Sequence, residues 1–433
     1  MRIASCTLSI LLAGCTPSEE ARPKASANTG ADTGAQTQDD TGGDTSNQDA
    51  DGDGVPTDED CDDSDPDLGA RAQDADCDGV EATGDCDDAD PTLGLETDDA
   101  DCDGILDPDD PCPDDPWNDA DGDGICGDVD PICDGDFEIH GADSEADIAM
   151  LSMCTRITGN LLVYETTVRT LAGLENLAEI GGGLSLSRND SLTSLEGLSA
   201  LSAIGLGLSI QENPALMGID GLDALSRVEG GVLVMNNPNL GHVDGLSSLE
   251  SIGDFLTLSD VPLRSIAGLS KLGEVGGSVT VEGTELTTMD GLSSLTGVGY
   301  NLTFARNNAL QNITGLSSLE AVGHALVIRD NDALFHIDGL ASVQTIGDSI
   351  SLVENGQLRN LYGLLQIRAV PGSLILLEND SLDDIVGIGG IATVGADLYI
   401  SANDRLCQST VDGLIAGVEV GGTVTTADNA TCG

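Results

Sequence analysis

Basic residues are scarce in this chain. Only 15 Lys and Arg residues stand against 77 Asp and Glu residues, which gives a formal net charge of −62 over 433 residues. A protein this acidic repels polyanions, so we expect it to bind neither nucleic acid nor anionic lipid. Without bound cations, its most acidic segment should repel itself and expand.

Catalytic motifs are also lacking. The four histidines form no HExxH sequence or other metal-binding spacing, and no Gly-x-Ser-x-Gly sequence occurs. His242 and His336 stand at equivalent positions of a repeat, which indicates that they belong to the repeat pattern and do not form a catalytic pair. Since no nucleophile, base and orienting group come together, we predict that the protein is not an enzyme. The other two histidines are His140 and His324.

The apolar run at the N-terminus is short. It extends from Ile3 to Ala13 and cannot cross a membrane as a permanent helix, but it is typical of a signal peptide. It ends in Leu12-Ala13-Gly14-Cys15, which resembles a bacterial lipobox. The resemblance implies cleavage before Cys15 and lipid attachment to Cys15, so 1–15 is predicted to be a lipoprotein signal peptide. Because Thr16 follows, it also implies the outer membrane; a plain signal peptide is the alternative.

Large apolar residues are almost lacking from 16–48. This segment is rich in Ala, Ser, Thr, Gly, Gln and Asp. Such a composition cannot bury a core, so we predict a flexible tether that holds the folded part away from the lipid surface.

Residues 49–132 form an acidic block in which one phrase occurs four times. Each copy reads Asp-x-Asp-x-Asp-Gly followed by Val or Ile, with a further Asp seven residues beyond the third. This is the ligand spacing of an EF-hand loop, at positions 1, 3, 5, 7 and 12, although Asp replaces Glu at position 12 and the flanking helices are lacking. Such oxygen ligands suit calcium. The predicted ligands are Asp49, Asp51, Asp53, Val55 and Asp60; Asp74, Asp76, Asp78, Val80 and Asp85; Asp99, Asp101, Asp103, Ile105 and Asp110; and Asp119, Asp121, Asp123, Ile125 and Asp130.

The acidic block resembles thrombospondin type 3 repeats and the acidic metal-binding motif of the MopE type. The phrases Asp60-Cys-Asp-Asp-Ser-Asp-Pro66 and Asp85-Cys-Asp-Asp-Ala-Asp-Pro91 carry the second resemblance. Some members of the MopE group are associated with copper, but this block has no His. We predict calcium as a folding ligand bound at about 0.1–1 mM. A solvated acidic linker is the alternative.

Cysteine spacing indicates an oxidising compartment. Ten of the twelve cysteines remain once Cys6 and Cys15 are assigned to the signal peptide and the lipid site. Steps of 16, 16 and 14 residues in the acidic block suggest local disulfides. Zinc is the competing interpretation, but the spacings are not CxxC and no His lies nearby. The suggested pairs are Cys61–Cys77, Cys86–Cys102 and Cys112–Cys126.

A repeat occupies the region from Ile157 to Asn429. A Gly-Leu step recurs every 23 or 24 residues, with one spacing of 26 at the end, and such a period is typical of a solenoid. In each copy two apolar residues alternate with a polar one, the pattern of a strand with one buried face. We predict a mainly β fold, a right-handed β-solenoid of about twelve coils with one parallel strand per coil. The inward pairs are Leu161/Val163, Leu184/Leu186, Leu208/Ile210, Val232/Val234, Leu256/Leu258, Val279/Val281, Leu302/Phe304, Leu326/Ile328, Ile350/Leu352, Leu374/Leu376, Leu398/Ile400 and Val424/Thr426.

Asparagine recurs three residues after the second inward residue, as at Asn189 and Asn213, with Asp260 and Gly283 read as breaks in the row. Asn tolerates left-handed backbone and suits a turn that ends a strand, and stacked Asn side chains can bond to one another along the axis. The next apolar pair, as in Leu192/Leu195, is predicted to form a second short strand. Gly-Leu then predicts a turn with a single helical turn.

The repeat resembles the receptor L-domain family of leucine-rich β-helices over residues 133–432. The entry segments Cys133-Asp-Gly-Asp-Phe-Glu-Ile139 and Cys154-Thr-Arg-Ile-Thr-Gly-Asn-Leu161 resemble the capping start of such a domain. The resemblance implies a Cys133–Cys154 disulfide in this cap, and Cys407–Cys432 would close the last coil. This sequence has more coils than one such domain usually has, so either two units are fused or one array has grown by duplication.

The outward residues of the solenoid offer a recognition surface. Toward the C-terminal coils this row becomes apolar, which is unusual for a surface in water. A protein or glycan contact surface is predicted there, and burial under a loop or the acidic block is the alternative. The candidate residues are Val327, Val353, Ile375, Leu377 and Tyr399.

Three functions are compatible with these features. The leading one is a lipid-anchored bacterial surface protein in which a calcium-stabilised acidic stalk presents a recognition solenoid, 133–433. The second is a surface protein that sequesters calcium or copper in its acidic block. The third is a structural envelope component with no specific ligand.

Overall fold

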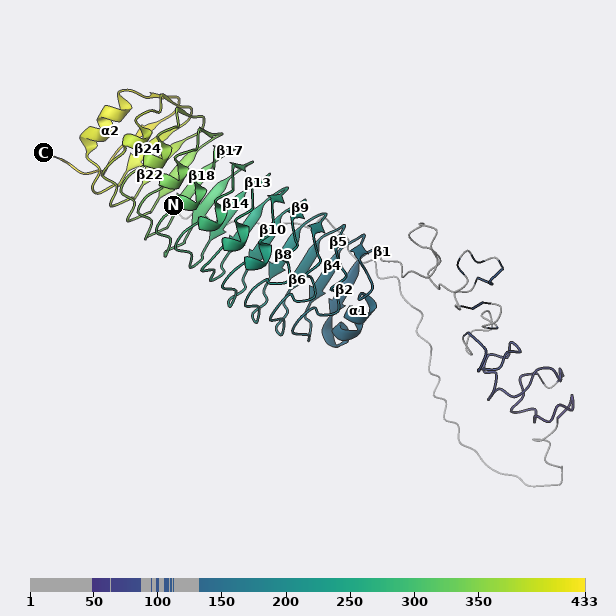
Figure 1. Cartoon of the computed structure of the whole chain (residues 1–433). Helices are drawn as coiled ribbons and strands as arrows, with labels where there is room; N and C mark the ends of the chain where they lie inside the picture. The colour runs from purple at the N-terminus through teal and green to yellow at the C-terminus, as the bar shows by residue number, and fades with distance from the viewer. Residues whose placement is uncertain are drawn as a thin grey trace, which may run out of the picture. The chain divides into compact units, whose positions relative to one another are not determined.

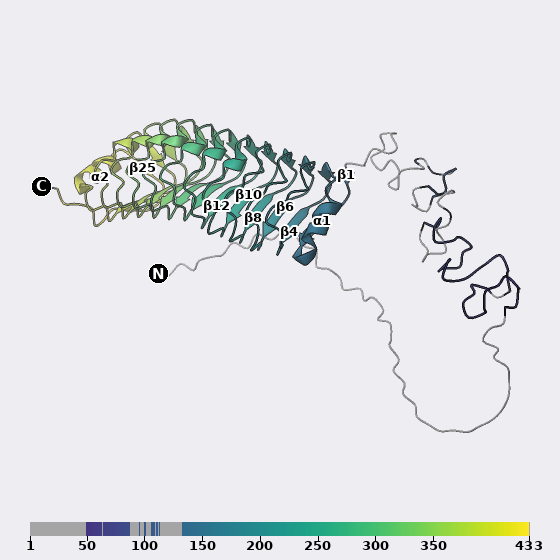
Figure 2. The ribbon, with the colours of Figure 1, turned by 60° about the horizontal axis from the view of Figure 1, so that its bottom comes forward.

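The computed structural model describes residues 49–62, 64–86, 95, 99–100, 105–108, 110, 112 and 132–432. The chain divides into two compact units, 1–92 and 93–433. The predicted signal peptide, Cys15 and the tether lie outside the described residues. Within the described part, no helix has both the length and the apolar character needed to cross a membrane. Figures 1 and 2 show the solenoid from two sides.

The described residues of the first unit, 49–62 and 64–86, consist of turns and bends. An antiparallel bridge joins Asp60 to Ala70. A disulfide joins Cys61 to Cys77, with Cα atoms 5.4 Å apart. The buried residues here are aspartates rather than apolar side chains, so this segment has no hydrophobic core of its own.

A cap precedes the first coil of the solenoid. It consists of β1 (Ile132–Cys133), β2 (Phe137–His140), the short 3-10 helix η1 (Gly141–Asp143) and α1 (Ser144–Met150). Ile148 of α1 and the following Leu151 are 6% and 1% exposed, so they cover the apolar end of the first coil. The predicted disulfide between Cys133 and Cys154 ties the cap together.

The predicted inward pairs lie in one 13-stranded parallel sheet, which β2 begins. Neighbouring strands pair in register, so that Leu184 lies beside Leu208 and Leu208 beside Val232. Except in the last strand, every residue of these pairs is at most 2% exposed. The fold prediction is therefore confirmed. The strands are β4 (Leu161–Tyr164), β6 (Leu184–Ser187), β8 (Leu208–Gln211), β10 (Val232–Met235), β12 (Leu256–Ser259), β14 (Val279–Glu282), β16 (Leu302–Ala305), β18 (Leu326–Arg329), β20 (Ile350–Val353), β22 (Leu374–Leu377), β24 (Leu398–Ser401) and β26 (Val424–Thr425).

A second face of the solenoid is formed by two-residue strands that precede the inward pairs. The predicted strand at Leu192/Leu195 is wrong: these residues are buried, but they lie in irregular backbone. The two-residue strands are β3 (Arg156–Ile157), β5 (Glu179–Ile180), β7 (Ala203–Ile204), β9 (Arg227–Val228), β11 (Ser251–Ile252), β13 (Glu274–Val275), β15 (Gly297–Val298), β17 (Ala321–Val322), β19 (Thr345–Ile346), β21 (Ala369–Val370), β23 (Thr393–Val394) and β25 (Glu419–Val420).

This second face divides between β19 and β21 into a ten-stranded and a three-stranded sheet. In the coil before, the N–H of Gly347 donates to the carbonyl of Val322. Pro371 stands at the equivalent position of the next coil and has no N–H to donate. One missing donor therefore accounts for the division.

From the fourth coil, at Gly245-Leu246, to the tenth, at Gly387-Ile388, the Gly-Leu steps lie in short 3-10 helices, as predicted. Because the last step, Gly413-Leu414, lies in α2 (Gln408–Ile415), it is an exception. The 3-10 helices stack along one edge of the solenoid (Figure 2). They are η2 (Asp244–Leu246), η3 (Ala267–Leu269), η4 (Asp290–Leu292), η5 (Thr314–Leu316), η6 (Asp338–Leu340), η7 (Tyr362–Leu364) and η8 (Val386–Ile388).

The last coil differs from the others. It carries α2 (Gln408–Ile415), and the predicted disulfide between Cys407 and Cys432 joins its two ends. Val424 is 42% exposed, so the last predicted inward pair is not buried. Since no further coil stacks on β26, its apolar face has nothing to pack against within the described residues.

Buried asparagines link the coils in two ladders. The Oδ1 of Asn213 accepts from the backbone N–H of Asn189 at 3.1 Å and from its Nδ2 at 2.9 Å, and the Nδ2 of Asn213 donates to the carbonyl of Leu186. The predicted stacking is therefore confirmed. The ladders comprise Asn189, Asn213 and Asn237, and then Asn307, Asn331, Asn355, Asn379, Asn403 and Asn429.

Two expectations about this turn are wrong. The left-handed residue precedes the asparagine, as at Arg188 with φ of 55°, and Asp260 and Gly283 occupy that position too. The side chains that interrupt the row are Val261 and Thr284, both buried. Stacking of the coils fixes the left-handed backbone of this residue, because its N–H donates to a carbonyl of the next coil. The N–H of Arg188, for example, donates to the carbonyl of Gln211.

Replacing Asn355 by Ala should destabilise the solenoid strongly. The carboxamide of Asn355 accepts from Asn331 and donates to the carbonyl of Ile328, and both groups would be left buried and unpaired. We expect the free energy of unfolding to fall by about 3 kcal/mol. Urea unfolding followed by circular dichroism measures this loss. The exposed Asn308 is the matched control, and equal effects of the two substitutions would contradict the ladder's role.

Candidate metal centre and recognition surface

The first acidic loop is shaped by its own carboxylates. Asp49 accepts from the N–H of Gly52 at 2.6 Å through Oδ1 and from that of Gly54 at 3.1 Å through Oδ2. Gly52 and Gly54 have φ of 86° and 104°, values that glycine adopts at little cost. These two turns wrap the backbone around the Asp49 carboxylate.

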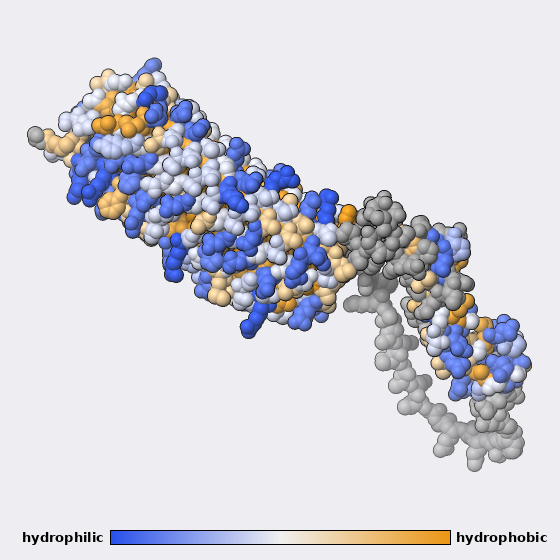
Figure 3. Space-filling view, viewed as in Figure 1, coloured by the Kyte–Doolittle hydropathy of each residue, from blue (hydrophilic) through white to orange (hydrophobic). Residues whose placement is uncertain are grey.

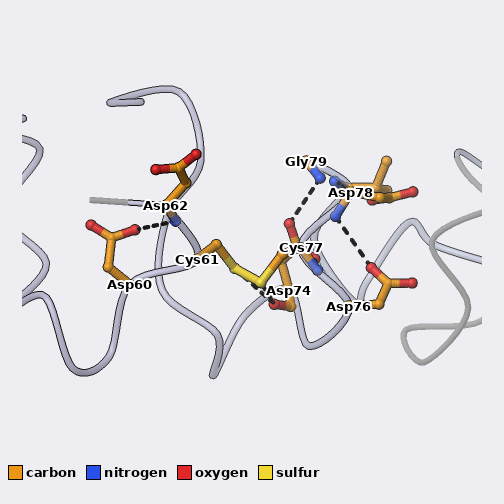
Figure 4. Close-up of a disulfide and its surroundings, with 9 residues drawn as sticks. Asp60, Cys61, Asp62, Asp74, Asp76, Cys77, Asp78 and Gly79 are labelled. Atoms are coloured by element: carbon orange, nitrogen blue, oxygen red, sulfur yellow. Dashed lines mark hydrogen bonds between the residues drawn. A yellow bond between two sulfur atoms is a disulfide. The ribbon is translucent and has the colours of Figure 1, made fainter. Parts of the chain in front are cut away.

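The second loop repeats this arrangement at Asp74. Its Oδ1 accepts from Cys77 at 2.7 Å and its Oδ2 from Gly79 at 2.9 Å, as Figure 4 shows for Gly79. Asp76 accepts from the N–H of Asp78, and Asp78 from that of Val80. Two segments with different intervening residues therefore adopt one loop geometry.

Carboxylate oxygens converge in both loops. Ligand atoms of Asp49, Asp51 and Asp53 lie within 4.8 Å of one another, and the same holds for Asp74, Asp76 and Asp78. The Oδ2 atoms of Asp51 and Asp76 are buried and accept no hydrogen bond. Buried acceptors without donors are costly, and a cation would satisfy them.

Position 12 of each loop is also buried. Asp60 and Asp85 are 3% and 8% exposed. Asp60 uses Oδ1 to accept from the N–H of Asp62 at 3.0 Å, whereas its Oδ2 is buried without a hydrogen bond. The Asp60 carboxylate is also close enough to Asp51 to affect its titration. The loop therefore brings its last acidic residue back toward its first three.

The pKa values of Asp51 and Asp76 are raised above the ordinary value of 3.8. Burial contributes most, and neighbouring carboxylates, among them Asp60 for Asp51 and Asp85 for Asp76, raise the pKa further. A hydrogen bond from the N–H two residues ahead acts in the opposite direction. Like charges are therefore crowded in both loops, and a bound cation would relieve the repulsion.

The donor set fits a hard cation. Around the first loop it consists of the carboxylates of Asp49, Asp51, Asp53 and Asp60, with the Val55 carbonyl at the position that supplies a backbone oxygen in loops of this spacing. Oxygen donors of this kind suit calcium rather than copper or zinc.

The third predicted loop is only partly described, and the fourth lies wholly outside the described residues. Asp99 is buried like Asp74 of the second loop, Asp110 is buried like Asp60 and Asp85, and Ile105 is exposed. The remaining predicted ligands of these loops lie outside the described residues: Asp101, Asp103, Asp119, Asp121, Asp123, Ile125 and Asp130.

The Cys61–Cys77 disulfide braces the two described loops against each other. Cys61 follows Asp60 at the end of the first loop, and Cys77 lies inside the second with φ of 63° (Figure 4). Cys86 and Cys112 are disulfide-bonded as well, whereas their predicted partners, Cys102 and Cys126, lie outside the described residues.

The predicted apolar recognition residues lie on one outer face, over β18 to β24. Ile375 pairs in register with Tyr399, and Val353 with Leu377. All five residues, including Val327, are half-buried. No described loop covers them, because residues 132–432 are accounted for by the cap, the coils and α2. Strand pairing therefore brings together four of the five positions, whereas Val327 is separated from Ile375 by Ser351.

A row of acidic residues borders this outer face. Asp330, Glu354 and Glu378 occupy the left-handed position of three successive coils. A hydrogen bond with Asp330 raises the pKa of Glu354, and the charges of Asp330 and Glu378 raise it further. At the N-terminal end of the row, Arg329 binds both Glu282 and Asp330. The outer face thus combines apolar and acidic character.

The four histidines have separate local contacts. His242 and His336 each lie 3.5 Å from the Asp two residues later and are separated by three intervening coils. His324 contacts the Asn301 side chain at 3.0 Å and stacks on Tyr300. His140 stacks on Tyr164.

Sequence analysis missed one exposed apolar group. Tyr362, Leu365 and Val386 are 41%, 45% and 62% exposed on η7 and η8. The sequence does distinguish this group, because the position of Tyr362 is polar in other coils, as at Asp338 and Thr314. The alternation of apolar and polar residues marks the strands and gives no information about these positions.

Residues 132–251 match the family model described as Receptor L domain. This match supports the predicted resemblance over the cap and the first coils. The 13-stranded sheet that begins there continues in register to β26. No curated protein sequence matches the chain. The Receptor L domain is a non-enzymatic, ligand-binding family, so the match supports a ligand-binding role for the solenoid.

Calcium binding to the acidic loops should weaken as the pH falls. Because the pKa values of Asp51 and Asp76 are raised, protons compete for these carboxylates at a higher pH than for an ordinary Asp. Without calcium, the stability of the folded loops depends on pH in the opposite direction. The raised pKa stabilises the folded loops below pH 3.8, and this contribution is lost as the pH rises through the folded-state pKa. Calorimetric calcium titration of the full chain at several pH values measures the competition.

The same titration identifies the ligands. Replacing Asp51 by Asn should remove one binding event or weaken it about tenfold, because the number of ligand charges sets calcium affinity. Asp58→Asn is the matched control, since Asp58 is exposed in the same segment. Equal calcium binding by the two variants would show that Asp51 is not a ligand.

Proposed function

We propose that this protein is a lipid-anchored bacterial cell-surface protein whose solenoid recognises a protein or glycan ligand. The main support is the match of the first coils to the Receptor L domain family, whose members bind ligands. In this proposal Cys15 carries the lipid, 16–48 serves as the tether, and 49–132 binds calcium. The outer membrane is the proposed location, and no enzymatic activity is assigned.

The ligand surface in this proposal is the outer face over β18 to β24. Its apolar residues are held by paired strands, so they require no rearrangement before binding. Tyr399 adds a hydroxyl that donates to Asp397 at 3.4 Å and remains half-exposed. Large amphipathic side chains of this kind are common at the centres of recognition sites.

The acidic segment acts as a calcium-dependent stalk in this proposal. Its converging carboxylates repel one another without a cation, and calcium would stabilise the closed loops by mass action. The Cys61–Cys77 disulfide would keep two such loops together while calcium comes and goes. Calcium would therefore affect how the solenoid is presented rather than which ligand it binds.

The outer face can be tested by the double substitution Ile375→Ser and Tyr399→Ser. Ligands are first sought with the full chain on a glycan array and by pull-down from surface extracts, in calcium. We expect the double variant to bind any recovered ligand about tenfold more weakly or worse, since the two side chains are paired neighbours within the proposed site. Thr257→Ser with Thr280→Ser is the control on the same sheet. Equal binding by all three proteins would remove the outer face from the proposal.

Metal sequestration is the second candidate function, because the acidic loops gather several carboxylates. Titrating the full chain with calcium and with copper distinguishes it from the first. A stalk should bind calcium at about 0.1–1 mM, the range of extracellular modules of this type. Submicromolar copper binding would instead favour sequestration.

A further inference from the structure

Aromatic residues are rare in this chain, and the solenoid leaves nearly all of them at its surface. The sequence has four Phe, four Tyr and one Trp. Of the eight that lie within the described residues, only Phe304 is buried. Aliphatic residues fill the core, Phe137 packs against it, and the Phe255 ring lies on Gly231 of the neighbouring coil. Such packing does not explain the exposed Tyr300, Phe335 and Tyr362.

Three exposed apolar residues form a group on the 3-10 helices of neighbouring coils. We call Tyr362, Leu365 and Val386 the edge patch. Tyr362 begins η7 and Val386 begins η8, so they occupy equivalent positions of adjacent stacked coils, and Leu365 follows η7 directly. The edge patch lies on the stacked helices and not on the face of the 13-stranded sheet, so it is separate from the proposed ligand surface.

The edge patch departs from the repeat. The position of Tyr362 is Asp in η2, η4 and η6 and Thr in η5. The position of Leu365 is Ser after η2, η3, η4 and η5. Polar residues at these positions therefore suffice for the coil to fold, and the three apolar side chains are not needed for stacking.

The edge patch is held in place by Asp384. Its Oδ2 accepts from the Tyr362 hydroxyl at 2.6 Å, and its Oδ1 accepts from the N–H of Val386 at 2.8 Å. One carboxylate thus fixes the tyrosine ring and the start of η8 together. A surface fixed in this way loses little conformational entropy when a partner binds.

The charge around Tyr362 is negative. Its hydrogen bond to Asp384 raises the pKa of the phenol, and the charges of Asp384, Asp338 and Asp383 raise it further. Two arginines also lie nearby and contact uncharged groups: Arg368 donates to the carbonyl of Leu365 at 2.8 Å, and Arg359 lies over the Phe335 ring at 5.3 Å. Three carboxylates, those of Asp338, Asp383 and Asp384, thus stand against two guanidinium groups.

We propose that the edge patch is a docking site for a basic amphipathic protein segment, one that presents aliphatic side chains beside Lys or Arg. The aliphatic side chains would cover Leu365 and Val386, and the basic ones would pair with Asp338 and Asp383. The net charge of −62 opposes a second copy of this chain as the occupant. Leu365 and Val386 offer no hydrogen-bonding side-chain groups, so they favour a protein segment over a glycan.

The test uses a fluorescent amphipathic peptide of leucine and lysine and the full chain in millimolar calcium. The comparison variant, Tyr362→Thr/Leu365→Ser/Val386→Thr, takes residues found at equivalent positions of other coils or polar residues of similar size. We expect it to bind the peptide about tenfold more weakly, as is usual when the apolar centre of a small interface is removed. The variant Ile375→Ser/Tyr399→Ser should bind the peptide as the unaltered protein does, which separates this proposal from that of the outer face.

The positions of cross-links distinguish peptide binding at the edge patch from peptide binding to the acidic segment. The peptide carries a photoreactive group in place of one leucine, and mass spectrometry locates the cross-links. We expect cross-links on the coils of Tyr362 and Val386, and we expect them to be lost in the triple variant. Cross-links confined to 49–132, or equal binding of an all-lysine peptide, would overturn the proposal.

Two further results would also overturn it. One is a glycan that binds the unaltered protein and not the triple variant, while the peptide binds both equally. The other is self-association in sedimentation experiments that the triple variant abolishes, which would make a second copy the occupant. An unfolding midpoint equal to that of the unaltered protein establishes that the triple variant is folded, so a loss of peptide binding then supports the proposal.

Discussion

Close stacking of one coil's backbone on the next is the constraint on which the solenoid depends. At Gly315 a side-chain carbon would meet the carbonyl of Met289 in the coil before, and at Gly291 it would meet that of Ile266. The recurring glycine of the Gly-Leu step therefore lets two backbones approach. Once they do, carbonyls at the strand ends lie away from water, and the carboxamides of the asparagine ladders provide their donors.

The sequence predicts most of this architecture because the residues that determine it recur at fixed positions of the repeat. Alternating pairs such as Leu208/Ile210 mark the long sheet, and the asparagine row marks the ladder. The two-residue strands were missed because a segment such as Glu179–Ile180 holds one inward residue, too few to display a period of two. The left-handed positions were missed because Glu165, Arg188 and Ala402 share no chemistry, so stacking rather than residue type sets their backbone. The edge patch appears only when each coil is compared with its neighbours.

The two described regions resist unfolding in different ways. The solenoid has a continuous apolar core, and its charged residues lie at the surface. The acidic loops have buried carboxylates in place of a core, with hydrogen bonds from backbone N–H groups and a disulfide. Their geometry was predictable from the Asp and Gly spacing, because each carboxylate binds backbone only a few residues away. The buried oxygens that accept no hydrogen bond were not predictable from the sequence, because their burial depends on how the loop closes.

The interruption of the asparagine ladder has a mechanical consequence. Val261 and Thr284 replace two asparagines, and the ion pairs of Arg306 with Asp260 and Glu282 span the same coils on the outside. Tension along the axis loads every interface between coils in series, so the one with the fewest buried hydrogen bonds yields first. Because ion pairs at a surface weaken with salt, the yield force at this point should depend on ionic strength. The interruption at these two coils would thus make the solenoid separate into two segments of defined length under load.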